Sequence, residues 1–290
     1  MRLTVFTPTY NRRNLIARTY ESLKNQTCLD FVWLIVDDGS TDDTKSLIDS
    51  YIAEGIIDIR YHYTENGGKM RAHNKGVMLC DTELFMCLDS DDWLKKDSVS
   101  EIYACIDKVA DEKVAGIVAH KGKTETEPLY DVDFPKGKDY SPLFELYLGG
   151  FKGETTLVYK TTVLREYMFP EIEGEKYVPE DYIYDKIDAK YTLYVLPKII
   201  TVCELVESGY TDSLKALKRN NKEAWYLYYE QRAFITPICL LKFKYLGYYI
   251  IYSRRCNKPL FKGNRISPAW VIPGIPFALA LIILGKEELH

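Results

Sequence analysis

The first 120 residues alternate between short apolar runs and amphipathic segments. The apolar runs are rich in β-branched and aromatic residues and predict buried strands at 3–6, 31–36, 56–63, 84–88 and 115–120. The intervening segments carry apolar residues at helical spacing, and they predict helices at 14–25, in the stretch ending at Gly55, after the Gly67-Gly68 turn, and at 97–109. This alternation predicts an α/β layered sheet with right-handed crossovers.

The pattern changes after His120. Residues 121–142 are polar with glycine and proline, which predicts a long surface loop. Short strands are expected at 154–159, 193–195 and 199–202, with a helix from Pro179 to about residue 190. From Lys215 onward the chain is helical, aromatic and basic, and residues 268–284 are almost purely apolar.

Length and composition bound the class of protein. A chain of 290 residues, 47% of them apolar, suits one large domain or two modest ones with a sizeable core. Seven scattered cysteines without a CxxC pair predict a reducing compartment and argue against a disulfide framework or a zinc site. Because the chain enters a strand at once, no signal peptide is expected.

Acidic residues follow two of the predicted strands. Asp37 and Asp38 end the second strand, and Asp89 and Asp91 follow the fourth. The carboxyl ends of parallel strands meet at one edge of a sheet, where open α/β folds bind ligands. Residues 66–76, which are glycine-rich, follow the third strand at the same edge. Crowded carboxylates favour a divalent cation, and the crevice as a whole suits a nucleotide.

Each of these features also has an ordinary structural interpretation. Asp37 and Asp38 could serve only to cap the next helix, and acid after a strand is common. Gly67 could belong to an ordinary turn. The chain lacks a GxGxxG fingerprint after its first strand and a Walker-type lysine, so neither common phosphate-binding motif applies. These three loops converge with residues 7–11, which follow the first strand, and the convergence of all four is what favours a nucleotide site.

Five short motifs together resemble the family 2 glycosyltransferases of GT-A fold. The motifs are VFTPTYNR at 5–12, VDDGSTD at 36–42, NGGK at 66–69, AHNKG at 72–76 and LDSDD at 88–92. They occur in the family's order across about the first 110 residues, and the sequence PED at 179–181 resembles its later acidic motif more weakly. The resemblance implies a mixed, mostly parallel GT-A sheet flanked by helices, with a C-terminal helical region.

The resemblance also implies roles for individual residues. Asp91 would hold Mg²⁺ or Mn²⁺, and Glu180 or Asp181 would be the catalytic base. Many relatives have a different order of residues after the glycines, which leaves the contacts of Lys69 and Arg71 open. The nucleotide sugar would be bound by Thr7, Pro8, Thr9, Asn11, Asp37, Asp38, Lys69, Arg71, Asn74, Asp89 and Ser90.

The expected domains are a GT-A catalytic domain at 1–214 and a helical region at 215–290. Within the first, residues 1–110 would bind the donor and 111–214 the acceptor. Residues 215–265 hold twelve Lys and Arg against two Glu, whereas the preceding chain is acidic. This basic, aromatic region could pack on the catalytic core as a helical subdomain, or it could attach peripherally to the cytoplasmic face of a membrane.

These features together predict an inverting, metal-dependent glycosyltransferase of the hexosyl or N-acetylhexosaminyl type. Its donor would be a nucleotide sugar, with a UDP-sugar expected, and its acceptor a cell-surface polysaccharide or lipid-linked oligosaccharide. We expect no nucleic-acid partner and a cytoplasmic location at the inner face of the cell membrane. A nucleotidyltransferase, a glycoside hydrolase and a non-catalytic sugar-nucleotide-binding protein are the alternatives.

Overall fold

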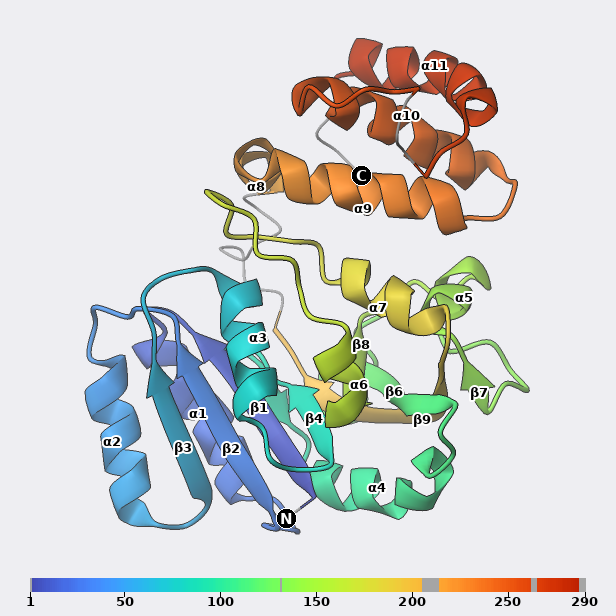
Figure 1. Cartoon of the computed structure of the whole chain (residues 1–290). Coiled ribbons are helices and arrows are strands. Elements are labelled where there is room, and N and C mark those ends of the chain that lie inside the picture. The colour runs from blue at the N-terminus through green and yellow to red at the C-terminus, as the bar shows by residue number, and fades with distance from the viewer. Residues whose placement is uncertain (1, 131, 205–213, 262–264, 287–290) are drawn as a thin grey trace. The chain divides into compact units, whose positions relative to one another are not determined.

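The computed structural model describes residues 2–130, 132–204, 214–261 and 265–286. The chain forms two compact units (Figure 1). The first comprises Met1–Met168 and Ile183–Glu204, and the second comprises Phe169–Tyr182 and Leu205–His290. The segment Phe169–Tyr182 therefore belongs with the C-terminal helices, although it lies between parts of the first unit in sequence.

The first unit is built on one mixed sheet whose order is β3-β2-β1-β4-β8-β6-β9-β5. Its first half is parallel and consists of β1 (Leu3–Thr9), β2 (Phe31–Asp37), β3 (Asp58–Tyr63) and β4 (Leu84–Cys87). Strand β8 (Thr155–Lys160) runs antiparallel to both of its neighbours, β4 and β6 (Val114–Gly122). Because of this reversal, β6 ends at the same edge as β1, β2 and β4.

Strand β9 (Thr192–Val202) pairs parallel with β6, and two short strands, β5 (Trp93–Leu94) and β7 (Tyr140–Ser141), pair antiparallel with β9. The expectation of a mostly parallel sheet flanked by helices is therefore confirmed.

The helices of the first unit cover both faces of the sheet. Leu3 and Val5 point into a core with α1 (Arg13–Lys24) and α2 (Thr44–Glu54), while Phe6 points to the opposite face. There Phe6 packs against His73 of α3 (Lys69–Leu79), with ring centroids 5.8 Å apart. The remaining helices are α4 (Ser98–Ala104), η1 (Ile106–Val109), α5 (Leu143–Leu148), α6 (Thr161–Glu166) and α7 (Asp181–Asp188).

Three local predictions were wrong. Lys121, predicted to start a long loop, lies inside β6, and part of the same stretch forms β7. The two short strands predicted at 193–195 and 199–202 are one strand, because β9 follows β6 through two register shifts around His120. The helix predicted at 97–109 ends at Ala104 and continues as a separate 3₁₀ turn.

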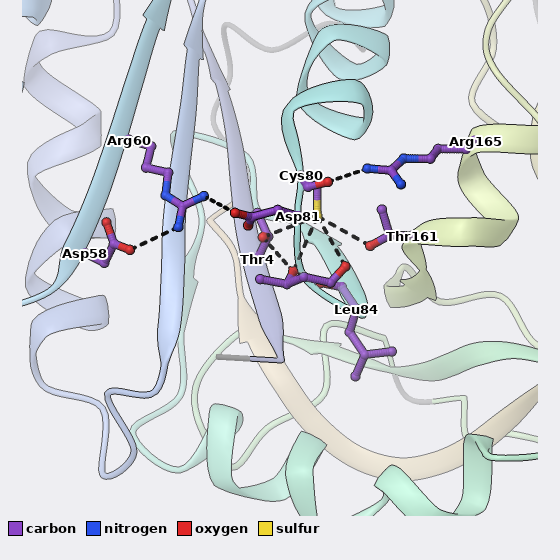
Figure 2. A network of polar contacts seen from close by, with 9 residues as sticks. Thr4, Asp58, Arg60, Cys80, Asp81, Leu84, Thr161 and Arg165 are labelled. Carbon is purple, nitrogen blue, oxygen red and sulfur yellow. Dashed lines mark hydrogen bonds and ion pairs between the residues drawn. The ribbon is translucent and has the colours of Figure 1, made fainter.

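The connection from α3 to β4 is fixed by a polar network at the edge opposite the loops that end β1, β2 and β4 (Figure 2). The thiol of Cys80 lies 3.3 Å from the hydroxyl oxygens of Thr4, Thr82 and Thr161. Arg60 forms an ion pair with Asp81 at 2.9 Å from the side of β3. These contacts join β1, β3, β4 and α6, and they seat β4 beside β1.

In the part of the second unit that the structure describes, four helices accompany the Phe169–Tyr182 segment. The helices are α8 (Leu214–Asn220), α9 (Lys222–Ile235), α10 (Leu240–Arg255) and α11 (Pro268–Ile283). The carboxylate of Glu175 accepts hydrogen bonds from the backbone N–H groups of Glu223 and Ala224, each at 2.8 Å, and so caps α9. The cap attaches the segment to the helices.

An aromatic core holds these helices together around a buried lysine. The ammonium of Lys218 is fully buried, 4.7 Å from the ring centroid of Trp225 and 5.3 Å from that of Tyr248. It also donates a 2.9 Å hydrogen bond to the hydroxyl of Tyr229. Cation–π contacts of this kind stabilise a desolvated cation, so the high tyrosine content serves packing here.

Helix α11 buries one face and exposes the other. Gly274 and Ala278 pack against Leu246 and Gly247 of α10. The exposed stripe, defined by Ile272, Ile275, Leu279, Ile282 and Ile283, contains no charged residue and is between 42% and 81% solvent-accessible. Among the described residues, no helix has the length and apolar character needed to cross a membrane.

The α3–β1 contact predicts a specific sensitivity at Gly76. A Cβ atom there would lie 2.4 Å from the fully buried ring of Phe6. Gly76→Ala should lower the free energy of unfolding by about 1–3 kcal/mol, despite alanine's higher helix propensity, because the ring has no room to move. Urea denaturation would measure this effect. Met78→Ala, on the exposed side of the same helix, is the control, and equal stability of the two variants would contradict the prediction.

Candidate functional site

The loops that follow β1 and β2 are tied together by Asn11. Its side-chain oxygen accepts hydrogen bonds from the backbone N–H of Thr41 at 2.8 Å and of Asp42 at 3.3 Å. The backbone N–H of Asn11 donates to the hydroxyl of Ser40 at 2.8 Å. Asn11 has a positive φ of 51°, which asparagine tolerates better than most residues. In the structure, Asn11 therefore connects the loop after β1 to the loop after β2.

Asp37 and Asp38 brace the same region from the end of β2. Asp37 is fully buried, and its carboxylate accepts bonds from the hydroxyl of Tyr61 at 2.6 Å and the N–H of Ser40 at 2.7 Å. The Asp38 carboxylate accepts bonds from the N–H groups of Gly67 at 2.7 Å and Gly68 at 2.8 Å. The side-chain amide of Asn66 also donates to the Asp38 carboxylate, at 3.2 Å, so Asp38 joins the loop after β2 to the turn before α3.

Glycines allow the loop after β2 to approach the turn before α3 closely. Gly39 has a φ of +86°, and a Cβ there would lie 2.9 Å from the backbone nitrogen of Asn66. Gly68, with a φ of 96°, precedes the first residue of α3. The glycines, read from sequence as a turn, bring the loops after β2 and β3 into direct contact.

Lys69 connects this turn to the residues after β4. Its ammonium lies 2.8 Å and 3.0 Å from the two carboxylate oxygens of Asp89. Desolvation raises the pKa of Asp89, but the nearby cations, chiefly Lys69 and Lys121, lower it below its ordinary value. Arg71 instead donates to the carbonyl of Gly67 at 2.7 Å, and Asn74 is buried on the same helix.

Side chains of α1 bind the backbone of residues 88–92, here named the acid loop. Arg18 donates to the carbonyl of Asp91 at 2.7 Å and stacks 4.0 Å from the ring centroid of Trp93. Thr19 donates to the carbonyls of Asp92 at 2.8 Å and of Ser90 at 3.2 Å. The buried hydroxyl of Thr19 therefore fixes the backbone of the acid loop.

The side chain of Asp91 stays partly open. It is 28% exposed, and the guanidinium of Arg12 lies 4.0 Å from one of its oxygens. Arg18 extends the same cluster by a 2.6 Å ion pair with Glu204, beyond the end of β9.

Asp92 is buried and paired with Lys121, at the end of β6. The Lys121 ammonium is 2.8 Å from an Asp92 oxygen and 3.7 Å from Glu154. Burial raises the pKa of Asp92 to about 6, against the effect of Lys121. Burial alone would lower the pKa of Lys121, but the carboxylates of Asp92, Asp89 and Glu154 raise it well above its ordinary value. The lysine therefore stays charged.

The three β1 residues predicted to bind the nucleotide sugar are all buried. The hydroxyl of Thr7 accepts a 3.0 Å bond from the indole N–H of Trp33 and so supports the core. Pro8 follows within the strand. The hydroxyl of Thr9 is buried and has no hydrogen-bond partner within the described ranges.

Glu180 and Asp181 belong to the second unit, at the start of α7. A carboxylate oxygen of Asp181 lies 2.9 Å from the guanidinium of Arg232, which α9 supplies. Arg232 is only 6% exposed, so Asp181 offsets a buried positive charge.

The acid loop offers one carboxylate to a divalent ion. No cluster of three or more His, Cys, Asp and Glu in the described ranges is arranged to hold a metal. Asp89 and Asp91 are both partly exposed, but Asp89 contacts Lys69 at 2.8 Å and the buried Asp92 contacts Lys121, whereas the cation paired with Asp91, Arg12, lies 4.0 Å away. Mg²⁺ and similar ions are commonly held by one or two carboxylates together with substrate phosphates, so Asp91 fits an ion whose coordination a diphosphate completes.

The sequence prediction did not include Lys121, Arg18 or the pairing of Asp92 with Lys121. Lys121 was hidden by the prediction of a loop, and only the continuing strand places it at this edge. Thr19, a polar residue on the predicted buried face of its helix, was an available signal that α1 makes polar contacts there.

Comparison with known proteins shows the family of this chain. The family model "Glycosyl transferase family 2" matches residues 4–168. A teichoic acid poly(glycerol phosphate) polymerase of Staphylococcus epidermidis is 37% identical over 100 residues. That alignment covers 34% of this chain and only 14% of the polymerase.

Solved structures share the fold at lower identity. Staphylococcus aureus TarS 1-349 in complex with UDP-GlcNAc matches with a TM-score of 0.62 at 19% identity, over 88% of this chain and 73% of that one. The mannosyltransferase PcManGT of Pyrobaculum calidifontis, in complex with GDP-Man and Mn²⁺, matches with a TM-score of 0.56 at 18% identity, over 97% and 75%. The architecture is the GT-A fold, as the resemblance implied.

Proposed function

Because the chain belongs to glycosyl transferase family 2, we propose that it is a metal-dependent, inverting enzyme that uses a nucleotide-sugar donor. The donor is a UDP-sugar of the hexosyl or N-acetylhexosaminyl type. The acceptor is a hydroxyl of a cell-surface polysaccharide or lipid-linked oligosaccharide. The nature of the relatives supports this choice, since the matched proteins include a teichoic acid polymerase and a UDP-GlcNAc-bound transferase.

One observation carries the proposal: the acid loop presents Asp89 and Asp91 partly exposed while Arg18 and Thr19 of α1 fix its backbone. Asp89 and Asp91 are 33% and 28% exposed, whereas Asp92 is buried. Asp89 would accept bonds from the ribose hydroxyls. Asp91 would bind the divalent ion, which stabilises the negative charge that develops on the departing diphosphate.

The chain's own residues orient the donor. Asp38 and the backbone it braces form the nucleoside end of the crevice, and Lys69 and Arg12 lie within reach of the acid loop's carboxylates. Their positive charges suit the diphosphate. Glu180 or Asp181 takes the proton of the acceptor hydroxyl as it attacks the anomeric carbon. Attack opposite the leaving group inverts that carbon.

Donor binding and turnover test the proposal directly. The wild-type protein, with Mn²⁺, should show thermal stabilisation with one of UDP-GlcNAc, UDP-glucose or GDP-mannose, and should release nucleoside diphosphate from it when a cell-wall polysaccharide is supplied as the acceptor. Asp91→Asn should reduce turnover by about 100-fold or more while keeping the fold, because the leaving charge loses its counter-ion. Asp43→Asn, an exposed carboxylate on a neighbouring loop, is the control. A non-catalytic binding protein would bind the donor without turnover, and that result would refute the enzyme.

The identity of the base is tested by two conservative variants. Glu180→Gln and Asp181→Asn each remove one proton acceptor, and one of them should lower kcat by about 10²–10⁴-fold with the donor KM nearly unchanged. Because Asp181 pairs with Arg232, thermal melts must accompany the assay. Full activity in both folded variants would exclude this acidic pair.

We also propose that the second unit contacts the cytoplasmic face of a membrane. The α11 stripe exposes contiguous apolar side chains, which soluble surfaces rarely do without a partner. Exposed cations in the same unit complement anionic headgroups; they are Lys215, Arg219, Lys222, Arg254, Lys258, Arg265 and Lys286. Such a helix would lie in the interface rather than span it.

Vesicle binding tests this surface. Wild-type protein should sediment with vesicles containing phosphatidylglycerol, and less with purely zwitterionic ones. The double variant Ile275→Asp, Leu279→Asp should weaken binding about tenfold or more, since two apolar side chains leave the acyl region. Met78→Asp, an exposed apolar position of the first unit, should change nothing. Absence of wild-type sedimentation with either lipid would disprove membrane contact.

A further inference from the structure

The ion pair between Lys121 and Asp92 is unusual for its burial. Their side chains are 18% and 8% exposed, and their charged atoms are 2.8 Å apart. Burying a charge pair is costly, and hydrophobic residues of similar size often serve stability as well or better. Because stability alone does not explain a buried ion pair, the position of Lys121 and Asp92 indicates another role.

The pair joins parts of the sheet that are not neighbours. Asp92 follows β4 and Lys121 ends β6, and β8 lies between these two strands. Two strand spacings amount to about 10 Å, a distance that the long lysine side chain helps to bridge. Asp92 also donates its N–H to the carbonyl of Asp89 at 3.0 Å. Fixing the Asp92 side chain therefore fixes the turn that carries Asp89.

The opposite side of the acid loop is fixed by α1, through Arg18 and Thr19, which bind only its backbone carbonyls. Among the acid loop's carboxylates, Asp92 is the one turned into the protein, while those of Asp89 and Asp91 stay partly exposed. The loop thus has one buried carboxylate, that of Asp92, and two partly exposed ones. The ion pair with Lys121 holds the Asp92 carboxylate in its buried position.

We propose that Lys121 is a positioning residue for the transfer reaction. By binding Asp92 it holds the acid loop in the conformation that presents Asp89 and Asp91 to the ribose and diphosphate of the donor. The inference rests on the proposed function for its substrate, but its geometry is independent of which sugar is transferred. Lys121 itself touches neither reacting atom.

Kinetics separate positioning from simple stabilisation. Lys121→Met should lower kcat/KM for the active donor among UDP-GlcNAc, UDP-glucose and GDP-mannose by about 10–100-fold and raise the Mn²⁺ concentration needed for half-maximal rate. Lys121→Arg should restore much of the activity. Lys123→Met, an exposed lysine two residues away, is the control. Wild-type kinetics in Lys121→Met would overturn the proposal.

A double variant addresses misfolding. Lys121→Met with Asp92→Asn removes both charges, so no buried carboxylate is left without its partner, and the protein should melt close to the wild type. Its turnover and Mn²⁺ requirement should nevertheless stay impaired, because the acid loop has lost its anchor. Recovery of wild-type kinetics in this variant would show that the pair is dispensable for positioning.

A third measurement does not depend on the reaction. Amide hydrogen exchange should be at least about tenfold faster at residues 89–93 in Lys121→Met than in the wild type or in Lys123→Met. Unchanged exchange would refute the anchoring role even if no donor is found. Conversely, absence of wild-type turnover together with accelerated exchange would refute the proposed function and leave the anchoring role intact.

Discussion

Mutual repulsion among carboxylates at one edge of the sheet is the constraint on which the first unit depends. Asp89, Asp91 and Asp92 lie within four residues of one another, so the acid loop persists only if cations from elsewhere oppose it. Each carboxylate has its own cation, from a different part of the chain. The pairs are Lys69 with Asp89, Arg12 with Asp91 and Lys121 with Asp92.

The order of the sheet supplies these cations. Parallel β1 and β4 place Arg12 beside the acid loop, and the β3–α3 turn contributes Lys69. Strand β8 is antiparallel to both β4 and β6, so β6 runs in the same direction as β4. It therefore ends at the same edge, where it places Lys121. The three carboxylates differ in burial: Asp92 is buried, whereas Asp89 and Asp91 are partly exposed.

The second unit follows a different principle. It is held together by tyrosine and tryptophan rings around the ammonium of Lys218, and Glu175 ties the Phe169–Tyr182 segment to α9. Helix α11 then has more apolar surface than α10 can cover, since α10 meets only the face that carries Gly274 and Ala278. The result is a helical unit with an apolar face that the described helices leave uncovered.

The sequence by itself determined the alternation of strands and helices in the first 120 residues, because hydrophobic periodicity is local. It also placed Asp38, Asp89 and Asp91 at the ends of strands, which predicted the edge, and the five motifs in their order predicted the family. Only the tertiary structure decided how each acid is used. Whether Asp92 faces Lys121 or solvent depends on a lysine 29 residues away in the sequence and on the direction of β8, and no local pattern encodes that pairing.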